Sequence, residues 1–414
     1  MANEVDPIRS SVYSTLPLEI WRMIFASANE VVEPMDNHCD GFDPLNERFH
    51  IENPITSKST QYTLMFVSKV FNALAVEFFL QTVTISGTKQ LTLLYKCLRK
   101  SSNFARNFAR WTRRFDFHSE IISFTNLEGP GLFCLAPILR ICRNLTHLII
   151  ELPRLVPTDG KRILNACLES CRVLEVLHWG IRCPVPRSKF ISTFRHIRII
   201  RLSDLNQFTV SSQTSTSRPL VPDEFPFLHT IEGGRDDFSI LFENVSLPSL
   251  STVHIRNEDY KDVHLPSNTG LHAFAQKHGE RIKTLTMVGV VGVRHGPAAV
   301  PFLRQFTTLQ ELVVDVADLL RLISYGNFIH PHVVRLGLTN YCQAIPWRTR
   351  DSFRAALPGK VKARFPALKV LRWFGYIFIP SSDANDHDDW EGTEGIRIED
   401  RNGEQLKLSW LSMV

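Results

Sequence analysis

The chain has 414 residues, 44% of them hydrophobic and 21% charged, which excludes a disordered chain and allows more than one hydrophobic core. Lys and Arg number 47 against 42 Asp and Glu and form no long tract, so a nucleic-acid partner is not expected. No apolar run reaches the ~18 residues of a membrane-spanning helix, and residues 1–15 lack the pattern of a signal peptide. We therefore expect a soluble protein of the cytoplasm or nucleus with no membrane partner. The eight scattered cysteines are typical of a reducing compartment.

Two short amphipathic helices are predicted near the start of the chain. The first spans the stretch STLPLEIWRMIF, in which Pro17 suits the first helical turn and Glu19 favours the positive end of the helix dipole. A polar, proline-containing interruption follows at about residues 30–61. Apolar residues at steps of three and four from Leu64 to Phe78 then predict the second helix. Isolated helices of this length are marginal in water, so the two must pack on each other and on something else.

The two helices together resemble an F-box. The resemblance rests on LPLEIWRMIF followed by LMFVSKVFNAL, with Phe71 where the family usually has Trp. The long interruption is similar to those of the large fungal set of F-box proteins. The resemblance implies docking on a Skp-family adaptor and, through it, on a cullin-RING ubiquitin ligase of the SCF type. The residues that it assigns to the adaptor are Leu16, Pro17, Ile20, Ile24, Phe25, Val67, Ser68, Phe71 and Leu74.

A six-residue pattern, apolar at its first, fourth and sixth positions, recurs from residue 80 onward. It starts at residues 80, 112, 145, 174, 197, 228, 250, 282, 309, 333 and 368, more weakly at 112 and 228. Helical stretches are predicted between these units, at residues 91–100, 132–144, 161–171, 271–280, 300–309 and 318–328. The basic stretch 106–117 is expected to be a solvated helix-to-strand segment. Units too small for a core of their own predict an α/β fold, a leucine-rich-repeat-like solenoid with a curved parallel sheet inside and helices outside.

These patterns divide the chain into three parts. Residues 11–80 are expected to form the F-box-like helical domain, and residues 81–380 the solenoid. Residues 381–414 are expected to form an acidic linker and a β-hairpin around Asn402-Gly403 that packs on the last repeat and closes the open edge of the sheet.

Alternation along the predicted strands separates core residues from residues of the concave face. Leu148 and Ile150, Leu177 and Trp179, and Leu285 and Met287 are expected to point into the core. Their neighbours are expected to form an exposed row in which Glu232 and Glu311 accompany the candidate target-binding residues. Those candidates are His147, Glu151, His178, Arg201, His254, Arg256, Asp315, Arg335 and Arg372. Acids and arginines balance in this row, so it predicts no charge for the partner.

No catalytic or cofactor-binding pattern is present in the sequence. It has no Gly-x-Ser-x-Gly elbow, no phosphate-binding Gly-x4-Gly-Lys-Ser/Thr loop and no His-Glu-x-x-His pair. Cys167 and Cys171 stand four apart on a predicted helix, but no second cysteine pair completes a zinc site. The acidic stretch 383–389 lacks the glycine and closing glutamate of a calcium loop. We therefore expect no metal, no cofactor and no enzymatic activity.

Two functions remain open at this point. The first is a substrate-recognition subunit of an SCF-type ubiquitin ligase, which docks the adaptor through its helices and binds an unidentified protein target through its solenoid. The alternative is a leucine-rich-repeat scaffold or interaction protein acting outside a ubiquitin ligase, in which the two helices only cover the end of the solenoid.

Overall fold

The computed structural model describes the helices, the strands and the turns that join them closely. The described residues are 17–28, 63, 65–118, 132–152, 157–181, 190–191, 193–202, 224–234, 238, 242, 245–256, 269–288, 296–324, 328–339, 360–374, 395–399 and 405. Leu16, the whole interruption at residues 30–61, Leu64, the acidic linker and most of the predicted hairpin lie outside the described residues.

The described strands form one open sheet of twelve parallel strands. They follow chain order from edge to edge, so each strand pairs only with the strand before it and the strand after it. Their bounds are β1 Thr82–Ser86, β2 Arg114–His118, β3 His147–Leu152, β4 Val176–Ile181, β5 Ile199–Leu202, β6 Thr230–Gly234, β7 Thr252–Arg256, β8 Thr284–Val288, β9 Glu311–Asp315, β10 Arg335–Thr339, β11 Val370–Trp373 and β12 Arg397–Glu399.

The first eleven strands coincide with the eleven predicted units. Each begins two residues after the first residue of its unit, and this holds for the weaker units at 112 and 228 as well. β12 comes from the predicted hairpin and pairs in parallel with β11. An antiparallel bridge joins Glu399 to Gln405 on the two sides of Asn402-Gly403. The first arm of the hairpin therefore continues the sheet as a further strand.

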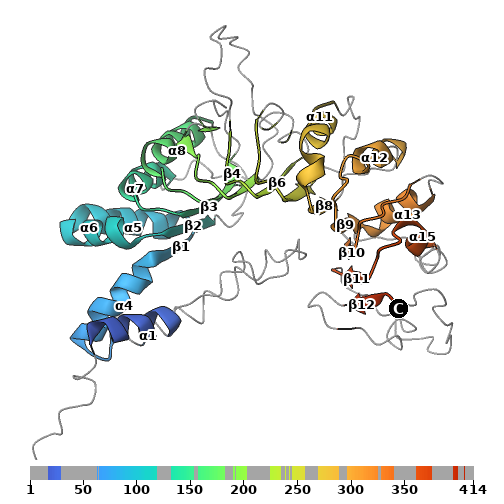
Figure 1. The fold of residues 1–414 in the computed structure, drawn as a ribbon. Coiled ribbons are helices and arrows are strands. Elements are labelled where there is room, and N and C mark those ends of the chain that lie inside the picture. Colours follow the sequence, from blue (N-terminus) through green and yellow to red (C-terminus); the bar gives the residue numbers. More distant parts are fainter. Residues whose placement is uncertain are drawn as a thin grey trace, which may run out of the picture.

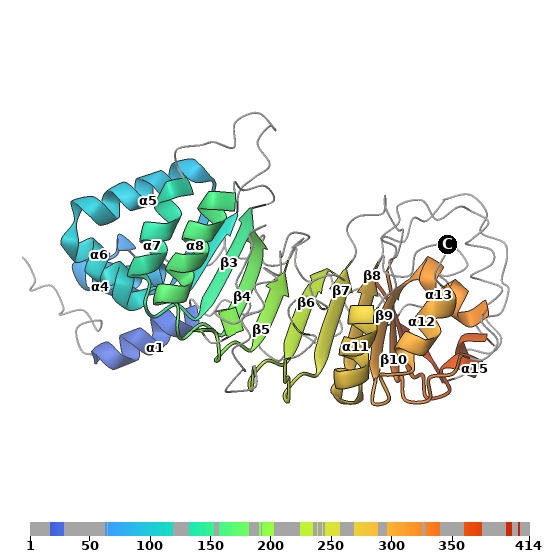
Figure 2. The same cartoon turned by 90° about the horizontal axis from the view of Figure 1, so that it is seen from above.

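The helices cover the outer face of this curved sheet, while the strands line its inner face (Figures 1 and 2). Two helices, α1 and α4, project beyond the β1 end (Figure 1). The described helices are α1 Leu18–Ala28, α4 Lys69–Gln81, α5 Thr88–Lys100, α6 Ser102–Trp111, η3 Leu132–Cys134, α7 Leu135–Ile141, α8 Pro157–Ser170, α11 Thr269–His278, η4 Gly279–Arg281, α12 Gly296–Leu303, α13 Val316–Ser324 and α15 Lys362–Arg364. The fold is thus a solenoid-like α/β fold, as expected.

Some predicted helices are too long, most of all the one at residues 300–309. Residues 300–309 were expected to be helical, but α12 ends at Leu303 and the following residues form the turn before β9. The hydroxyl of Thr308 donates a hydrogen bond of 2.8 Å to the carbonyl of Glu280, which ties this turn to the preceding repeat. The helical periodicity of the segment is overridden by this contact between repeats.

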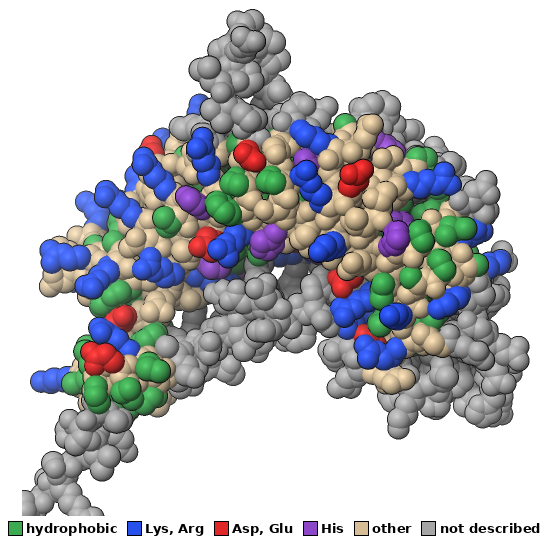
Figure 3. Space-filling model, in the orientation of Figure 1, with side chains coloured by type: hydrophobic (Ala, Val, Ile, Leu, Met, Phe, Trp, Pro, Cys, Tyr) green, Lys and Arg blue, Asp and Glu red, His purple; other side chains and the backbone are tan. Residues whose placement is uncertain are grey.

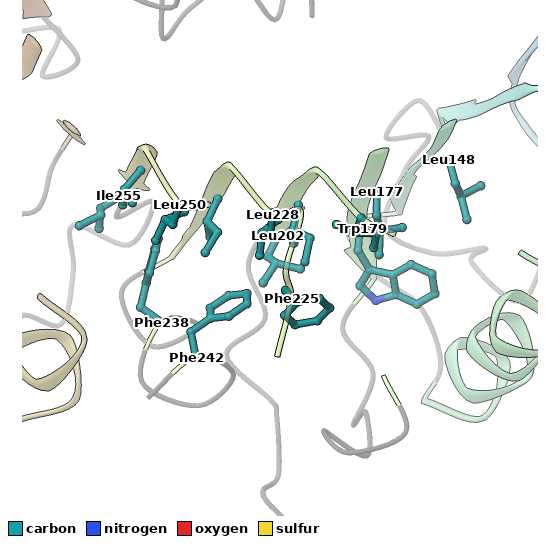
Figure 4. Packing of buried hydrophobic residues seen from close by; sticks show 14 of the residues in the cluster. Leu148, Leu177, Trp179, Leu202, Phe225, Leu228, Phe238, Phe242, Leu250 and Ile255 are labelled. Carbon is teal, nitrogen blue, oxygen red and sulfur yellow. The ribbon is translucent and has the colours of Figure 1, made fainter. Parts of the chain in front are cut away.

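The core lies between the sheet and the outer helices. All six residues expected to point inward, from Leu148 to Met287, are at most 1% exposed, which confirms the predicted alternation. Phenylalanine side chains continue the core beneath the middle strands, where Phe225 and Phe242 lie 6.4 Å apart and Phe238 and Phe274 lie 5.1 Å apart between ring centroids. Figure 4 shows Phe225 and Phe242 on the same side of the sheet as Trp179.

A ladder of backbone hydrogen bonds fixes where each strand begins. In nine successive repeats, one carbonyl accepts hydrogen bonds from two consecutive amides of the next repeat. The carbonyl of Arg113, for example, accepts from the amides of Thr146 at 2.8 Å and His147 at 3.0 Å. The carbonyl of Thr146 then accepts in the same way from Glu175 and Val176. This repetition holds the strands in one register although the connections between them differ in length.

Candidate interaction surfaces

The helix pair α1 and α4 is held together by its own small aromatic core. Phe25 is 1% exposed, and its ring centroid lies 5.3 Å from that of Phe71 and 6.0 Å from that of Phe78. Trp21 packs edge-on against Phe71 at 4.6 Å, and Leu74 is buried beside them. This cluster is separate from the core of the solenoid.

The start of α4 is fixed by a side-chain cap. The hydroxyl of Ser68 accepts a hydrogen bond of 3.1 Å from the amide of Phe71, as an N-cap residue does. The side chain of Asn72 donates a bond of 3.0 Å to the carbonyl of Met65 and holds the preceding turn against the helix. At its other end α4 passes into β1 without a connecting residue. The helix pair is therefore continuous with the sheet.

Exposed apolar side chains concentrate on this helix pair. Eight of the thirteen large hydrophobic residues that are exposed in the described part of the chain belong to α1, to α4 or to the turn before α4. Figure 3 shows hydrophobic side chains gathered over this projecting part of the molecule. The eight residues are Leu18 at 43%, Ile20 at 39%, Met23 at 66%, Ile24 at 44%, Phe66 at 74%, Val67 at 61%, Val70 at 56% and Phe79 at 37%.

Of the nine residues assigned to the adaptor, the eight that the structure describes divide between the surface and the inside of the pair. Pro17, Ile20, Ile24 and Val67 are exposed, and Ser68 is the exposed cap of α4. The expectation of a docking surface needs correction for the three residues that form the small aromatic core, because packing between the helices buries two of them and partly buries the other. These three residues are Phe25, Phe71 and Leu74.

Five exposed apolar residues of the helix pair were not among the adaptor-binding candidates, namely Leu18, Met23, Phe66, Val70 and Phe79. Met23 follows Ile20 by three positions, and Phe66 and Val70 flank Val67. Helical spacing from the residues already chosen would have found Met23 and Val70. We call Ile20, Met23, Ile24, Val67 and Val70 the apolar helix face.

The second candidate surface is the concave face of the sheet. All eleven residues expected there lie on the side of the strands opposite the core, which the register confirms. One row crosses the middle of this face on all twelve strands. Its members, in order, are Thr84, Asp116, Ile149, His178, Arg201, Glu232, His254, Thr286, Val313, Gly337, Arg372 and Glu399.

The centre of this row is an ion-paired cluster around Glu232. The carboxylate of Glu232 lies 2.8 Å from the Nε atom of Arg201 and 2.8 Å from that of Arg256. Burial alone would raise the pKa of Glu232, but the positive charges of Arg201 and Arg256 lower it to about 2. His254 is hydrogen-bonded to Thr286 at 2.9 Å, and burial lowers its pKa to about 4. At neutral pH the cluster therefore holds two cations, one anion and a neutral imidazole.

A second cluster joins the first strands of the concave face. Glu151 lies between two imidazoles, with Oε2 at 2.7 Å from His118 Nδ1 and Oε1 at 3.5 Å from His178 Nδ1. Burial alone would lower the pKa of His118, but the hydrogen bond and charge of Glu151 raise it above the ordinary value. Burial lowers the pKa of His178. His118 was missed by the sequence reasoning, although it stands in the same place in its unit as Glu151.

Several residues of the predicted exposed row are buried. Arg372 is 7% exposed because its guanidinium pairs with Glu399 at 2.8 Å, and Asp315 is 2% exposed. The carboxylate of Asp315 accepts a hydrogen bond of 2.9 Å from the amide of Ala317 and so holds the start of α13. His178 is 5% exposed. The expectation that these three residues form an exposed row is wrong, because each is held by contacts within the fold.

The remaining members of the predicted exposed row are half-buried. Arg335 pairs with Glu311 at 3.1 Å and its side chain is 35% exposed. The side chain of Glu151 is 42% exposed, and those of Arg201 and Arg256 are 11% and 23% exposed. His147 is half-buried at the start of β3. A partner entering the concave face would meet these side chains.

The buried cysteines are part of the packing. Cys142, Cys167 and Cys171 are all 0% exposed, and burial raises the pKa of the Cys142 and Cys167 thiols. Within the described ranges, no three His, Cys, Asp or Glu side chains are arranged to hold a metal ion. Among these residues there is also no helix with the length and apolar character needed to cross a bilayer.

Comparison with known proteins adds no assignment to this geometry. No family model and no curated protein matches the chain. The fold and the surfaces define a solenoid-like α/β protein with an apolar helix pair at one end and a charged concave face.

Proposed function

We propose that this chain is the substrate-recognition subunit of an SCF-type ubiquitin ligase. In this proposal the apolar helix face docks a Skp-family adaptor, and the concave face of a leucine-rich-repeat-like solenoid binds a protein target. The chain supplies no covalent chemistry. It raises the effective concentration of the target's lysines near the ubiquitin-loaded enzyme of the cullin-RING ligase.

The observation that carries the proposal is the exposure of the apolar helix face. Ile20, Ile24 and Val67 are 39%, 44% and 61% exposed on a helix pair whose own core is already complete without them. Exposed apolar patches on an otherwise polar surface mark interaction sites. The same three residues belong to the stretches that resemble an F-box, so exposure and resemblance agree on one surface.

The proposal is tested by co-purification of the full chain with a Skp-family adaptor. We expect the wild-type chain to retain the adaptor, and Ile20→Asp with Ile24→Asp to lose it, because two charges would be buried at the interface. Leu93→Asp is the matched control, since Leu93 is also exposed, at 61%, but lies on α5. Failure of the wild-type chain to bind, or retention by the double variant, would contradict the proposal.

A scaffold outside any ubiquitin ligase is the second candidate function. It is favoured by the packing of α4 on α6 and by its position beside β1, at the end of the sheet where a solenoid carries its cap. A cap accounts for the buried residues of the pair but leaves the exposed apolar face unexplained. Adaptor binding in the experiment above distinguishes the two candidates.

A further inference from the structure

Basic side chains are numerous on the described surface. The described residues include 31 Lys and Arg and 14 Asp and Glu. Ten of these fourteen acids lie in ion pairs with neighbouring basic residues. In Figure 3 Lys and Arg side chains gather over the end of the molecule that carries α5 to α8.

Four arginines occupy the same position in four successive repeats. Arg110, Arg143, Arg172 and Arg195 each stand four residues before the first residue of their strands, β2 to β5. Those first residues are aligned in register across the sheet. We call these four residues the arginine edge. Phe78 and Pro226 fill the equivalent positions before β1 and β6, so the row has two defined ends.

The arginine edge is exposed, and its charges are not compensated by any acid in the described part of the chain. All four side chains are exposed, and none forms an ion pair with a described residue. The acids of this region are already engaged, Glu169 with Arg140 at 3.0 Å and Glu175 with Arg198 at 3.6 Å. The end of α6 and the turns that carry the row are themselves fixed. The side chain of Asn144 donates to the carbonyl of Arg110 at 3.4 Å, and the backbone ladder joins the strands that follow.

Two exposed apolar side chains lie beside the arginine edge, one on the turn of Arg172 and one on the turn of Pro226 at the end of the row. Val173, the residue after Arg172, is 45% exposed, and Phe227, the residue after Pro226, is 53% exposed. The imidazole of His196 stacks on the ring of Phe227, with centroids 6.1 Å apart and planes 13° apart. A partner of the arginine edge would therefore meet apolar side chains as well as guanidinium groups.

We propose that the arginine edge binds an acidic protein segment in extended conformation. Neighbouring strands are ~4.8 Å apart, so the row spans about 14 Å. Alternate residues of an extended peptide recur every ~6.6 Å, so residues i, i+2 and i+4 span about 13 Å. Carboxylates at these positions can reach successive guanidinium groups, which bind carboxylates in bidentate pairs. An apolar residue of the segment packs on Val173 or Phe227.

A nucleic acid fits this surface less well. Salt-dependent binding to DNA rests on roughly 6 to 10 phosphate contacts, whereas the row offers four cations over a short span and ends at Pro226. The exposed apolar side chains of Val173 and Phe227 also suit a peptide side chain better than a sugar-phosphate backbone. This inference does not depend on adaptor docking, because it concerns a different surface and is measured on the chain alone.

The proposal is tested by fluorescence anisotropy with the full chain. The probe is a labelled peptide of about nine residues in which Glu and Ser alternate around one central Leu, long enough to cover the ~14 Å row. It is measured at about 50 mM salt, where surface charges are weakly screened. We expect binding, and we expect Arg143→Gln with Arg172→Gln and Arg195→Gln to weaken it on the order of tenfold, since each exposed pair contributes about two- to fivefold.

The matched control removes the same amount of charge from residues that also lie just before a strand, but in another repeat. Lys277→Gln with Arg281→Gln and Lys283→Gln changes three exposed side chains before β8, and we expect peptide affinity to change less than about twofold. Equal weakening by both triple variants would show attraction by net charge alone and overturn the proposal. Absence of peptide binding would overturn it too, as would tighter binding of a single-stranded oligothymidylate of similar length that the first triple variant abolishes. Thermal unfolding of both variants checks that the fold is retained.

Discussion

Glu232 lies between two guanidinium groups at the centre of the concave face. Its side chain is only 13% exposed, and Arg201 and Arg256 both pair with it at 2.8 Å. Removing the carboxylate would leave two partly buried cations close together. Removal of one member of a buried ion pair is costly for this reason, although partial exposure reduces the cost.

We predict that Glu232→Gln lowers the free energy of unfolding by about 1 to 3 kcal/mol at neutral pH. Glu175→Gln is the control, because the Glu175 and Arg198 side chains are 41% and 59% exposed and 3.6 Å apart. It should change stability by less than about 0.5 kcal/mol. Urea unfolding measures both, and equal effects would contradict the role given to Glu232.

Buried histidines make the fold sensitive to mild acid. His278 is 2% exposed, and burial together with the charges of Lys277 and Arg281 lowers its pKa to about 4. Between pH 6.5 and 4 the unfolded chain binds a proton at this side chain and the folded chain does not. Stability therefore falls as the pH drops through this window.

We predict that His278→Phe, which keeps a ring against Phe274, reduces the loss of stability between pH 6.5 and 4.5. At pH 8 the histidine is neutral in both states, so any difference there reports packing alone. The measurement is urea unfolding at several pH values. An unchanged pH dependence in the variant would contradict the prediction.

At the level of elements, α1 depends on α4 for its stability. An isolated helix of eleven residues is marginal in water, so α1 is held by the packing of Phe25 between Phe71 and Phe78 and by the ion pair of Arg22 with Glu77 at 3.5 Å. The solenoid has a separate core and does not need this contact.

We predict that Phe25→Ala detaches α1 while the solenoid stays folded. The local cost is about 3 to 5 kcal/mol, as for other buried phenylalanines. Hydrogen exchange should show loss of protection in α1 with little change in β3 to β8. Met23→Ala is the control, because Met23 is 66% exposed on the same helix and should leave protection unchanged. Loss of protection throughout the sheet would contradict a separate helix pair.

The strands could be predicted from the sequence, but the side-chain contacts between neighbouring strands could not. The six-residue pattern predicts β1 to β11 because each strand alternates between core and concave face over a few residues. Which side chains meet across strands depends on register, and the connections vary from unit to unit, so the contacts of Glu232 with Arg201 and Arg256 were not foreseen. The burial of Arg372 likewise depends on β12, which the sequence suggests only as part of a hairpin.

The adaptor-binding candidates show a similar limit at the level of single residues. Helical spacing predicts that Ile20, Ile24 and Phe25 belong to an apolar side of α1, but it does not say which edge of that side faces α4. Phe25 is buried there and Ile24 is not, because α4 approaches from one direction only. The arginine edge was missed because its residues are far apart in the sequence and meet only through the stacking of repeats.

At the level of the whole molecule, stability is local. Each strand pairs only with its two sequence neighbours, so a repeat is supported by adjacent repeats and not by a common centre. A defect in one repeat should therefore spread little along the sheet.

We predict that Leu336→Ala in β10 lowers local stability by about 2 to 5 kcal/mol, because Leu336 is 0% exposed. Hydrogen exchange should increase in β9, β10 and β11, while β2 to β5 keep their protection. A matched change at the other end, Leu148→Ala in β3, should give the reverse pattern. Uniform loss of protection in either variant would show that the sheet unfolds as one cooperative unit.

The paired hydrogen bonds at the start of each strand give insertions and deletions different effects in two parts of a repeat. The carbonyl of the preceding repeat sets the register of each strand. Insertions or deletions in an outer connection therefore leave every concave side chain opposite the same residue of the neighbouring strand. A single residue gained between that carbonyl contact and the strand would instead turn the strand over and exchange its inner and outer side chains. The outer connections can therefore vary in length, whereas the turns just before the strands must keep their length if the concave face is to keep its side chains.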